Sequence, residues 1–188
     1  MLQVTIRDKN FVWDEPISSN LGSFIVKISN NAIKELKNSH NFLNNSEHSF
    51  PILQKEITDF KKKFLVKGIG LFIIDGKCFT DFSKEESIEI YKKICKILGT
   101  LYIQNNKNEK LVKIHDEGKS MQTGGRYHQT KEGGSFHTDS PQWKKVPDFI
   151  GLCCVNPAKK GGQSKFVNVY NIHNEMLKEH KHFLEMLY

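Results

Sequence analysis

The stretch Phe136-His137-Thr138-Asp139, with Gly161-Gly162-Gln163-Ser164 further along, decides how this chain is interpreted. His137 and Asp139 are two positions apart, and on extended backbone such side chains point to the same side. An imidazole and a carboxylate placed in this way can bind one metal ion and leave neighbouring coordination positions open. The motif therefore predicts two of the three protein ligands of a non-heme iron site.

The composition predicts one globular domain and argues against a nucleic-acid-binding protein. Of the 188 residues, 38% are hydrophobic, which is enough for one core. Lysines and arginines outnumber acidic residues by 28 to 21, giving a net charge of +7, but only Arg7 and Arg126 are arginines. A nucleic-acid groove would cluster arginines with aromatic side chains. The scattered lysines instead predict a solvated surface that attracts small anions.

The remaining composition predicts a cytoplasmic protein with no membrane contact. The start of the chain lacks the long apolar core of a signal peptide, and no apolar run approaches the roughly 18 residues that span a bilayer. The cysteines lack the spacing of a metal-binding knuckle. We expect four reduced and mostly buried thiols: Cys78, Cys95, Cys153 and Cys154.

Hydrophobic periodicity predicts helices over residues 31–43 and 52–64 and a last helix near the C-terminus. A further helix begins at the capping box formed by Ser83 and Glu86 and ends before Gly99. We expect the buried stripe of this helix to be Ile88, Tyr91, Cys95 and Leu98, and that of the last helix to be Ile172, Met176, Phe183 and Leu187. Alternating or continuous apolar residues predict strands at residues 2–6, 11–13, 69–74, 111–114, 149–155 and 165–169.

These residues resemble the TauD/TfdA family, which includes the taurine dioxygenase-like and clavaminate synthase-like enzymes. The resemblance runs from about Gly68 to the last helix. It rests on a strand such as residues 70–74, the H-x-D motif, Pro147-Asp148 before a strand, and the segment Asn156-Pro157-Ala158-Lys159-Lys160-Gly161-Gly162-Gln163-Ser164. An H-x-D triplet alone is weak. Its occurrence before this segment, at the offset typical of the family, makes the resemblance specific.

The resemblance implies an α+β fold built on a partial double-stranded β-helix, or jelly roll, flanked by helices. It implies a single, incomplete domain over residues 1–188, with an N-terminal strand and helices over 1–67 and the first half of the jelly roll over 68–188. The C-terminal strands that complete the family's jelly roll have no counterpart here.

The resemblance also implies the chemistry of the site. His137 and Asp139 correspond to the first two ligands of the family's 2-His-1-carboxylate triad for iron(II). Ser164 corresponds to a threonine or serine whose hydroxyl helps to bind the distal carboxylate of 2-oxoglutarate, a co-substrate together with O2. The family reaction decarboxylates 2-oxoglutarate to succinate while it oxidises a small-molecule substrate.

Two parts of the family pattern are missing. In the family a distal histidine and an arginine that binds 2-oxoglutarate lie on later strands, but this sequence has no arginine after Arg126. Its histidines beyond Asp139 are His173, His180 and His182, which we interpret as solvated residues of the last helix. The chain is therefore expected to be a fragment or split half, or else a degenerate member with weakened metal binding.

Three functions follow, in order of preference. The first is an iron(II)- and 2-oxoglutarate-dependent dioxygenase that hydroxylates or otherwise oxidises a small polar metabolite. The alternative is a non-catalytic half-barrel that acts as a binding or interaction module. A metal isomerase of the cupin type is the third, because jelly rolls host many metal chemistries. Exposed strand edges and apolar faces predict a partner, either a second copy or a complementary C-terminal half.

Overall fold

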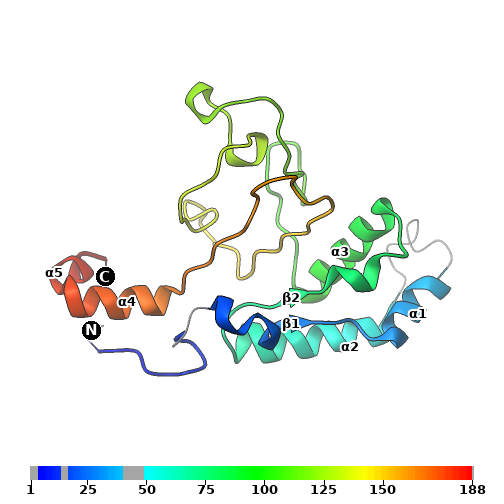
Figure 1. Ribbon diagram of the computed structural model, residues 1–188, viewed down its shortest axis with the longest axis horizontal. Coiled ribbons are helices and arrows are strands. Elements are labelled where there is room, and N and C mark those ends of the chain that lie inside the picture. The colour runs from blue at the N-terminus through cyan, green and yellow to red at the C-terminus, as the bar shows by residue number, and fades with distance from the viewer. Residues whose placement is uncertain (1–3, 14–16, 40–48, 188) are drawn as a thin grey trace. The chain divides into compact units, whose positions relative to one another are not determined.

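The computed structural model describes residues 4–13, 17–39 and 49–187, and the statements below refer to these residues. Most of the regular structure in the described residues is helical, and the strands form one two-stranded sheet (Figure 1). The elements are η1 (Ile17–Ser23), β1 (Ile25–Val26), α1 (Asn30–Asn38), α2 (Pro51–Phe60), η2 (Lys61–Val66), β2 (Ile73–Ile74), η3 (Gly76–Phe79), α3 (Lys84–Leu98), η4 (Met121–Thr123), η5 (Tyr127–Gln129), α4 (Val169–Glu179), α5 (Lys181–Leu184) and η6 (Glu185–Leu187).

The chain folds into two compact units. The first, here called the helical unit, consists of Met1–Leu98 and Val167–Tyr188, and the second, the loop unit, is Gly99–Phe166. The loop unit contains all the predicted site residues. The single domain with a division after residue 67 stays a prediction. None of the helices in the described ranges has the length and apolar character needed to span a bilayer.

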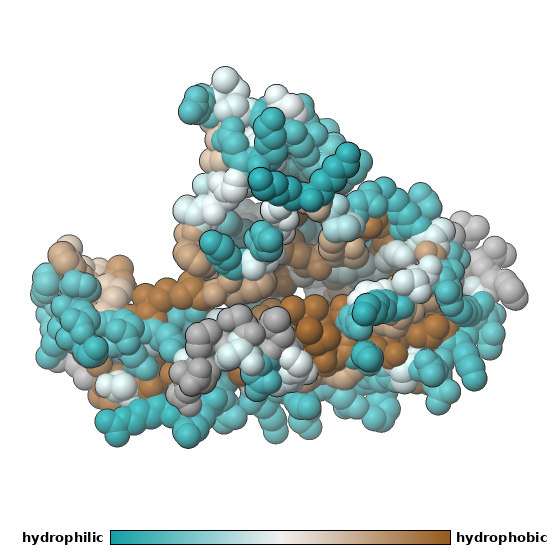
Figure 2. Space-filling view, in the orientation of Figure 1, coloured by the Kyte–Doolittle hydropathy of each residue, from teal (hydrophilic) through white to brown (hydrophobic). Residues whose placement is uncertain are grey.

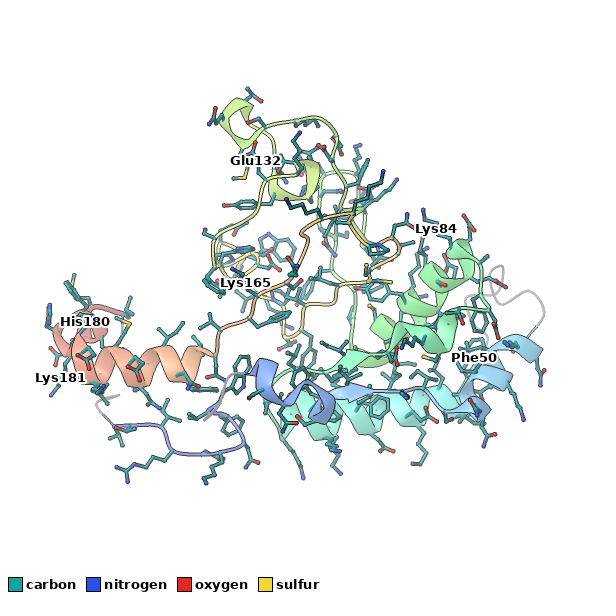
Figure 3. The ribbon with its side chains drawn as sticks, in the orientation of Figure 1. Phe50, Lys84, Glu132, Lys165, His180 and Lys181 are labelled. Atoms are coloured by element: carbon teal, nitrogen blue, oxygen red, sulfur yellow. The ribbon has the colours of Figure 1, made fainter. Side chains whose placement is uncertain are left out.

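The core of the helical unit forms where α1, α2 and α3 pack together. Leu36 of α1 and Leu53 and Ile57 of α2 are fully buried, and Phe50, at the start of α2 (Figure 3), belongs to the same cluster. The predicted helices over 31–43 and 52–64 are confirmed as α1 and α2, but α1 ends at Asn38, and residues 40–43 of the predicted helix lie outside the described residues.

The N-termini of α1 and α2 are capped by acidic side chains of the other helix. Glu35 accepts hydrogen bonds from the backbone N–H groups of Ile52 and Leu53, both at 3.1 Å. In return, Glu56 accepts one from the N–H of Ser29 at 3.0 Å. These N–H groups have no partner inside their helices, so the carboxylates both satisfy them and oppose the positive ends of the helix dipoles.

A π-helical segment, η2, continues α2 to Val66, and Gly68 lets the chain leave it. A Cβ atom on Gly68 would lie 2.5 Å from the carbonyl oxygen of Lys63, so only glycine fits this close approach. The predicted helix end at Gly68 is therefore confirmed, although the last turn is π-helical.

The capping box of α3 is confirmed, but its predicted buried stripe is wrong. The backbone N–H of Ser83 donates to Glu86 and the N–H of Glu86 donates to the hydroxyl of Ser83, at 2.7 and 3.2 Å. The buried side chains are Ile90 and Ile94, with exposures of 1% and 6%. Apolar residues lie on several sides of α3, so the position of α2, which the sequence does not reveal, selects the buried face.

The only sheet in the described residues is a short parallel pair. Ile25 is opposite Ile73 and Val26 is opposite Ile74, so the predicted strand over 69–74 shortens to its last two residues. Phe24, Val26 and Phe64 form a small second core beside it. This pair gives the helical unit an α+β character.

The other predicted strands are not formed in the described residues, and a partial jelly roll is therefore not confirmed. Residues 4–6, 11–13, 111–114, 149–155 and 165–169 carry no strand; residues 2 and 3 lie outside the described ranges. A strand requires a neighbour that pairs with its backbone. Figure 2 shows apolar side chains on the surface, and those exposed near these segments include Val146, Phe149, Ile150, Leu152, Val155, Phe166 and Val167.

Asparagine side chains of α4 take the place of a strand partner for the N-terminal segment, residues 4–13. Asn174 accepts from the N–H of Ile6 and donates to its carbonyl, both at 2.8 Å. Asn171 does the same for Trp13, at 2.9 and 2.8 Å. One carboxamide binds both groups at each position, so the N–H and the C=O of Ile6 face the same side chain, and those of Trp13 do likewise.

The C-terminal helices bury different residues from those predicted. His173 is only 5% exposed, and its Nε2 lies 3.2 Å from the carbonyl oxygen of Val4, so the expectation of a solvated histidine is wrong. Leu184 is buried, whereas Ile172, Phe183 and Leu187 are exposed. The predicted stripe assumed one continuous helix, but the chain changes direction at His180, where α4 gives way to α5.

Candidate metal centre

The site motif lies in an irregular segment of the loop unit, after η5. The Nε2 atom of His137 is 3.3 Å from Oδ1 of Asp139, and each side chain is 50% exposed. The structure thus brings the two predicted ligands together on one side of the backbone. Their roles as iron ligands stay predictions.

A backbone contact determines which ring nitrogen of His137 can bind a metal. Nδ1 lies 2.7 Å from the carbonyl oxygen of Ser135. A carbonyl can only accept, so Nδ1 carries the hydrogen and the neutral ring has its lone pair on Nε2. Histidines that bind metals commonly donate their second N–H to such a partner.

The lone pair on Nε2 and the Asp139 carboxylate oxygen would repel each other at 3.3 Å unless a positive charge lies beside them. A proton on Nε2 can supply that charge, and so can a bound cation. Two donor atoms about 2.1 Å from one ion and at a right angle are about 3.0 Å apart. The observed pair is close to this spacing, so the donor set fits two adjacent positions of an iron(II) ion.

The ring of His137 also stacks on the ring of Tyr127. The two planes are within 7° of parallel and their centroids are 5.7 Å apart. Gly134 lies against both rings, because a Cβ built on it would be 3.4 Å from Tyr127 and 3.7 Å from Cε1 of His137.

Tyr127 belongs to η5, and backbone hydrogen bonds tie η5 to an earlier segment of the loop unit. The N–H of His115 donates to the carbonyl of His128 at 3.1 Å, and that of Glu117 donates to the carbonyl of Gln129 at 2.9 Å. Tyr127 thus belongs to a pair of segments joined by backbone hydrogen bonds, here called the framework of the loop unit. His137 lies on the irregular segment that follows it.

Side chains reinforce this framework. The carboxylate of Glu117 accepts from Lys119 at 2.7 Å and from Gln129 at 3.0 Å, and the Lys119 hydrogen bond lowers the pKa of Glu117. Glu132, in the loop between η5 and His137 (Figure 3), accepts from the N–H of Met121 at 3.3 Å.

Immediately after Asp139 the chain turns. Ser140 has a φ of 52°, an uncommon conformation for a residue other than glycine. Its carbonyl accepts from the N–H of Trp143 at 3.0 Å, and the Trp143 ring contacts that of Tyr102. Trp143 therefore packs against Tyr102.

Ser164 lies in irregular chain after two glycines. Gly161 and Gly162 both have a φ of 77°, where other residues are strained. A Cβ on Gly162 would also lie 3.2 Å from Cβ of Ala158. The side chain of Ser164 is exposed, and the described part of the chain shows no hydrogen bond from it to His137 or Asp139. Its role toward 2-oxoglutarate stays a prediction.

Within residues 4–13, 17–39 and 49–187, no third histidine, cysteine, aspartate or glutamate completes a metal-binding group. Cys153 and Cys154 are exposed, which corrects the expectation of buried thiols for this pair. Sequence reasoning missed Tyr127 and the carbonyl of Ser135 as neighbours of the site. The only signal was the closeness of Tyr127 to the motif, because a backbone carbonyl leaves no trace in a sequence.

Most of this chain is similar in sequence to known proteins. No solved structure matches it. FR-33289 synthase from Streptomyces rubellomurinus (strain ATCC 31215) is 29% identical over 126 residues, which are 66% of this chain and 35% of that protein. The chain thus spans about a third of the length of this curated relative. Residues 47–188 match the family described as "Taurine catabolism dioxygenase TauD, TfdA family", and this chain belongs to that family.

Proposed function

We propose that this chain supplies two iron ligands, His137 and Asp139, of an iron(II)- and 2-oxoglutarate-dependent dioxygenase that hydroxylates or otherwise oxidises a small polar metabolite. The observation that carries the proposal is the pairing of Nε2 of His137 with Oδ1 of Asp139 at 3.3 Å, while Nδ1 is held by a carbonyl. Membership of a dioxygenase family supports the same reaction class.

When iron and its co-substrates are bound, they oxidise a substrate C–H bond to C–OH with one oxygen atom of O2, and the other enters succinate as 2-oxoglutarate loses carbon dioxide. The chain's own residues prepare this chemistry. The Ser135 carbonyl holds the hydrogen of the neutral His137 ring on Nδ1, which leaves the lone pair on Nε2, and Asp139 provides a negative oxygen next to it. We propose that the hydroxyl of Ser164 donates a hydrogen bond to the distal carboxylate of 2-oxoglutarate.

The curated relative is named for the product that it makes. Its name, FR-33289 synthase, says that it makes FR-33289. We extend to this chain only the class of reaction, an oxidation within small-molecule metabolism, and we propose that it takes place in the cytoplasm.

An alternative role as a non-catalytic interaction module is favoured by one observation. Large apolar side chains are exposed near residues 146–155, with Ile150 at 55% and Leu152 at 64%. Apolar surface of this kind marks contact with another chain. A second copy or a complementary C-terminal half would cover it, and the same partner could complete the iron site.

An anaerobic titration separates the two roles. The full chain is mixed with iron(II) and 2-oxoglutarate, and the visible charge-transfer band of the ternary complex is recorded before O2 is admitted and succinate is measured. If the chain is the proposed enzyme, we expect both the charge-transfer band and succinate, and we expect His137→Ala to abolish both. Ser164→Ala should raise the 2-oxoglutarate concentration required and leave iron binding intact. Iron binding without a band or succinate would favour the interaction module.

A further inference from the structure

Among the described residues, Ser135, Asp139 and Tyr127 make the polar and ring contacts of the His137 side chain, and of these Tyr127 alone lies outside its loop. Ser135 holds Nδ1 and Asp139 faces Nε2, but both residues are within two positions of His137 and move with it. The third contact is the stacked ring of Tyr127, ten positions away.

Tyr127 has the firmer attachment. It begins η5, whose carbonyls at His128 and Gln129 accept hydrogen bonds from residues 115 and 117. The carbonyl of Tyr127 itself accepts from the N–H of Thr130, which is buried. The stack therefore connects the segment with the predicted ligands to the framework of the loop unit.

We infer that Tyr127 is a positioning residue that fixes the plane of the His137 imidazole and so aims its Nε2 lone pair toward the proposed metal site. The inference rests on the proposed function. The contact is between the two aromatic rings, which are near-parallel and offset, with centroids 5.7 Å apart. The described residues show no hydrogen bond between the Tyr127 hydroxyl and His137, so phenylalanine should serve equally well.

Gly134 provides a second, independent way to disturb the stack. A methyl group at this position would make ordinary contacts with both rings, at 3.4 and 3.7 Å, so Gly134→Ala is expected to be tolerated. A leucine side chain would need space that the two rings already occupy, so Gly134→Leu should separate them.

The first experiment requires no metal. The His137 ring stacks against an aromatic ring, so we expect a ring-current shift of its Cε1–H resonance relative to the other exposed histidines. Tyr127→Leu and Gly134→Leu should remove this shift, whereas Tyr127→Phe and Gly134→Ala should keep it. An unchanged shift in Tyr127→Leu would show that the stack does not exist in solution.

The second experiment measures the affinity of the full chain for cobalt(II) alone, by its visible absorption. Because stacking of the two rings stabilises the orientation of His137, Tyr127→Leu should weaken cobalt binding by about 2- to 10-fold. Tyr127→Phe should bind cobalt with the native affinity. Native affinity in Tyr127→Leu, or an equal loss in Tyr127→Phe, would overturn the positioning role. If His137→Ala binds cobalt with native affinity, His137 is not a metal ligand and the proposed function is contradicted. The resonance of His137 in the metal-free chain then still tests whether the two rings stack.

Discussion

The carboxamide of Asn171 forms two hydrogen bonds with the main chain of Trp13, at 2.9 and 2.8 Å, although the residues are 158 positions apart. Asn174 repeats the arrangement at Ile6. The N-terminal segment, in which the sequence pattern predicts two strands, therefore finds hydrogen-bond partners for Ile6 and Trp13 on a helix.

Replacement of Asn171 by alanine should release this segment. Two partly buried backbone groups of Trp13 would lose their partner, at a cost of about 1–3 kcal/mol for the local structure. Amide hydrogen exchange at Trp13 should become faster, while Asn106→Ala, at an exposed position, serves as the control. Unaltered exchange at Trp13 would mean that Asn171 does not hold the segment.

Glu35 is expected to stabilise the start of α2. Glu35→Ala removes the acceptor for two N–H groups, and the loss of such a cap costs about 1 kcal/mol. Glu35→Gln keeps one acceptor oxygen and should lose less. Urea unfolding of the three proteins tests the order, and an alanine variant as stable as the native chain would contradict it.

Ile90 and Ile88 lie on the same helix, α3, and their alanine variants can be compared directly. Ile90 is 1% exposed, so Ile90→Ala should lower the free energy of unfolding by about 2–5 kcal/mol. Ile88, which the sequence pattern placed in the buried stripe, is only half-buried and its alanine variant should cost clearly less. An equal loss of unfolding free energy in the two variants would show that Ile88 is as buried as the sequence pattern predicted.

The ion pair of Lys37 and Asp81 predicts a small pH dependence. The hydrogen bond from Lys37, at 2.6 Å, lowers the pKa of Asp81 in the folded chain. The pair therefore stabilises the fold above the unfolded pKa of about 3.9, and this contribution is lost as the pH falls through the lower, folded value. Asp81→Asn should be slightly less stable at pH 7. The difference should vanish in acid; a difference that persists there would have another origin.

Local signals in the sequence predicted the helices well. The Ser83 and Glu86 capping box is confirmed because its two hydrogen bonds join residues three positions apart. His137 and Asp139 lie together for the same reason, since their spacing alone brings the side chains to one side.

Features that depend on distant parts of the chain could not be predicted in this way. The apolar run over residues 149–155 has strand composition but finds no pairing partner in the described residues. The buried face of α3 depends on where α2 lies, and the burial of His173 depends on the N-terminal segment. Tyr127 became part of the site only through the path of the backbone between η5 and His137.

The central claim is that His137 and Asp139 hold one iron(II) ion, and anaerobic equilibrium dialysis of iron(II) against the full chain tests it most directly. Loss of a hydrogen-bond partner that orients a metal ligand lowers metal affinity by about 10- to 100-fold, so loss of a ligand should cost more than about 100-fold. We predict that the native chain binds iron and that His137→Ala and Asp139→Ala each abolish this binding. Native affinity retained in both variants would contradict the account.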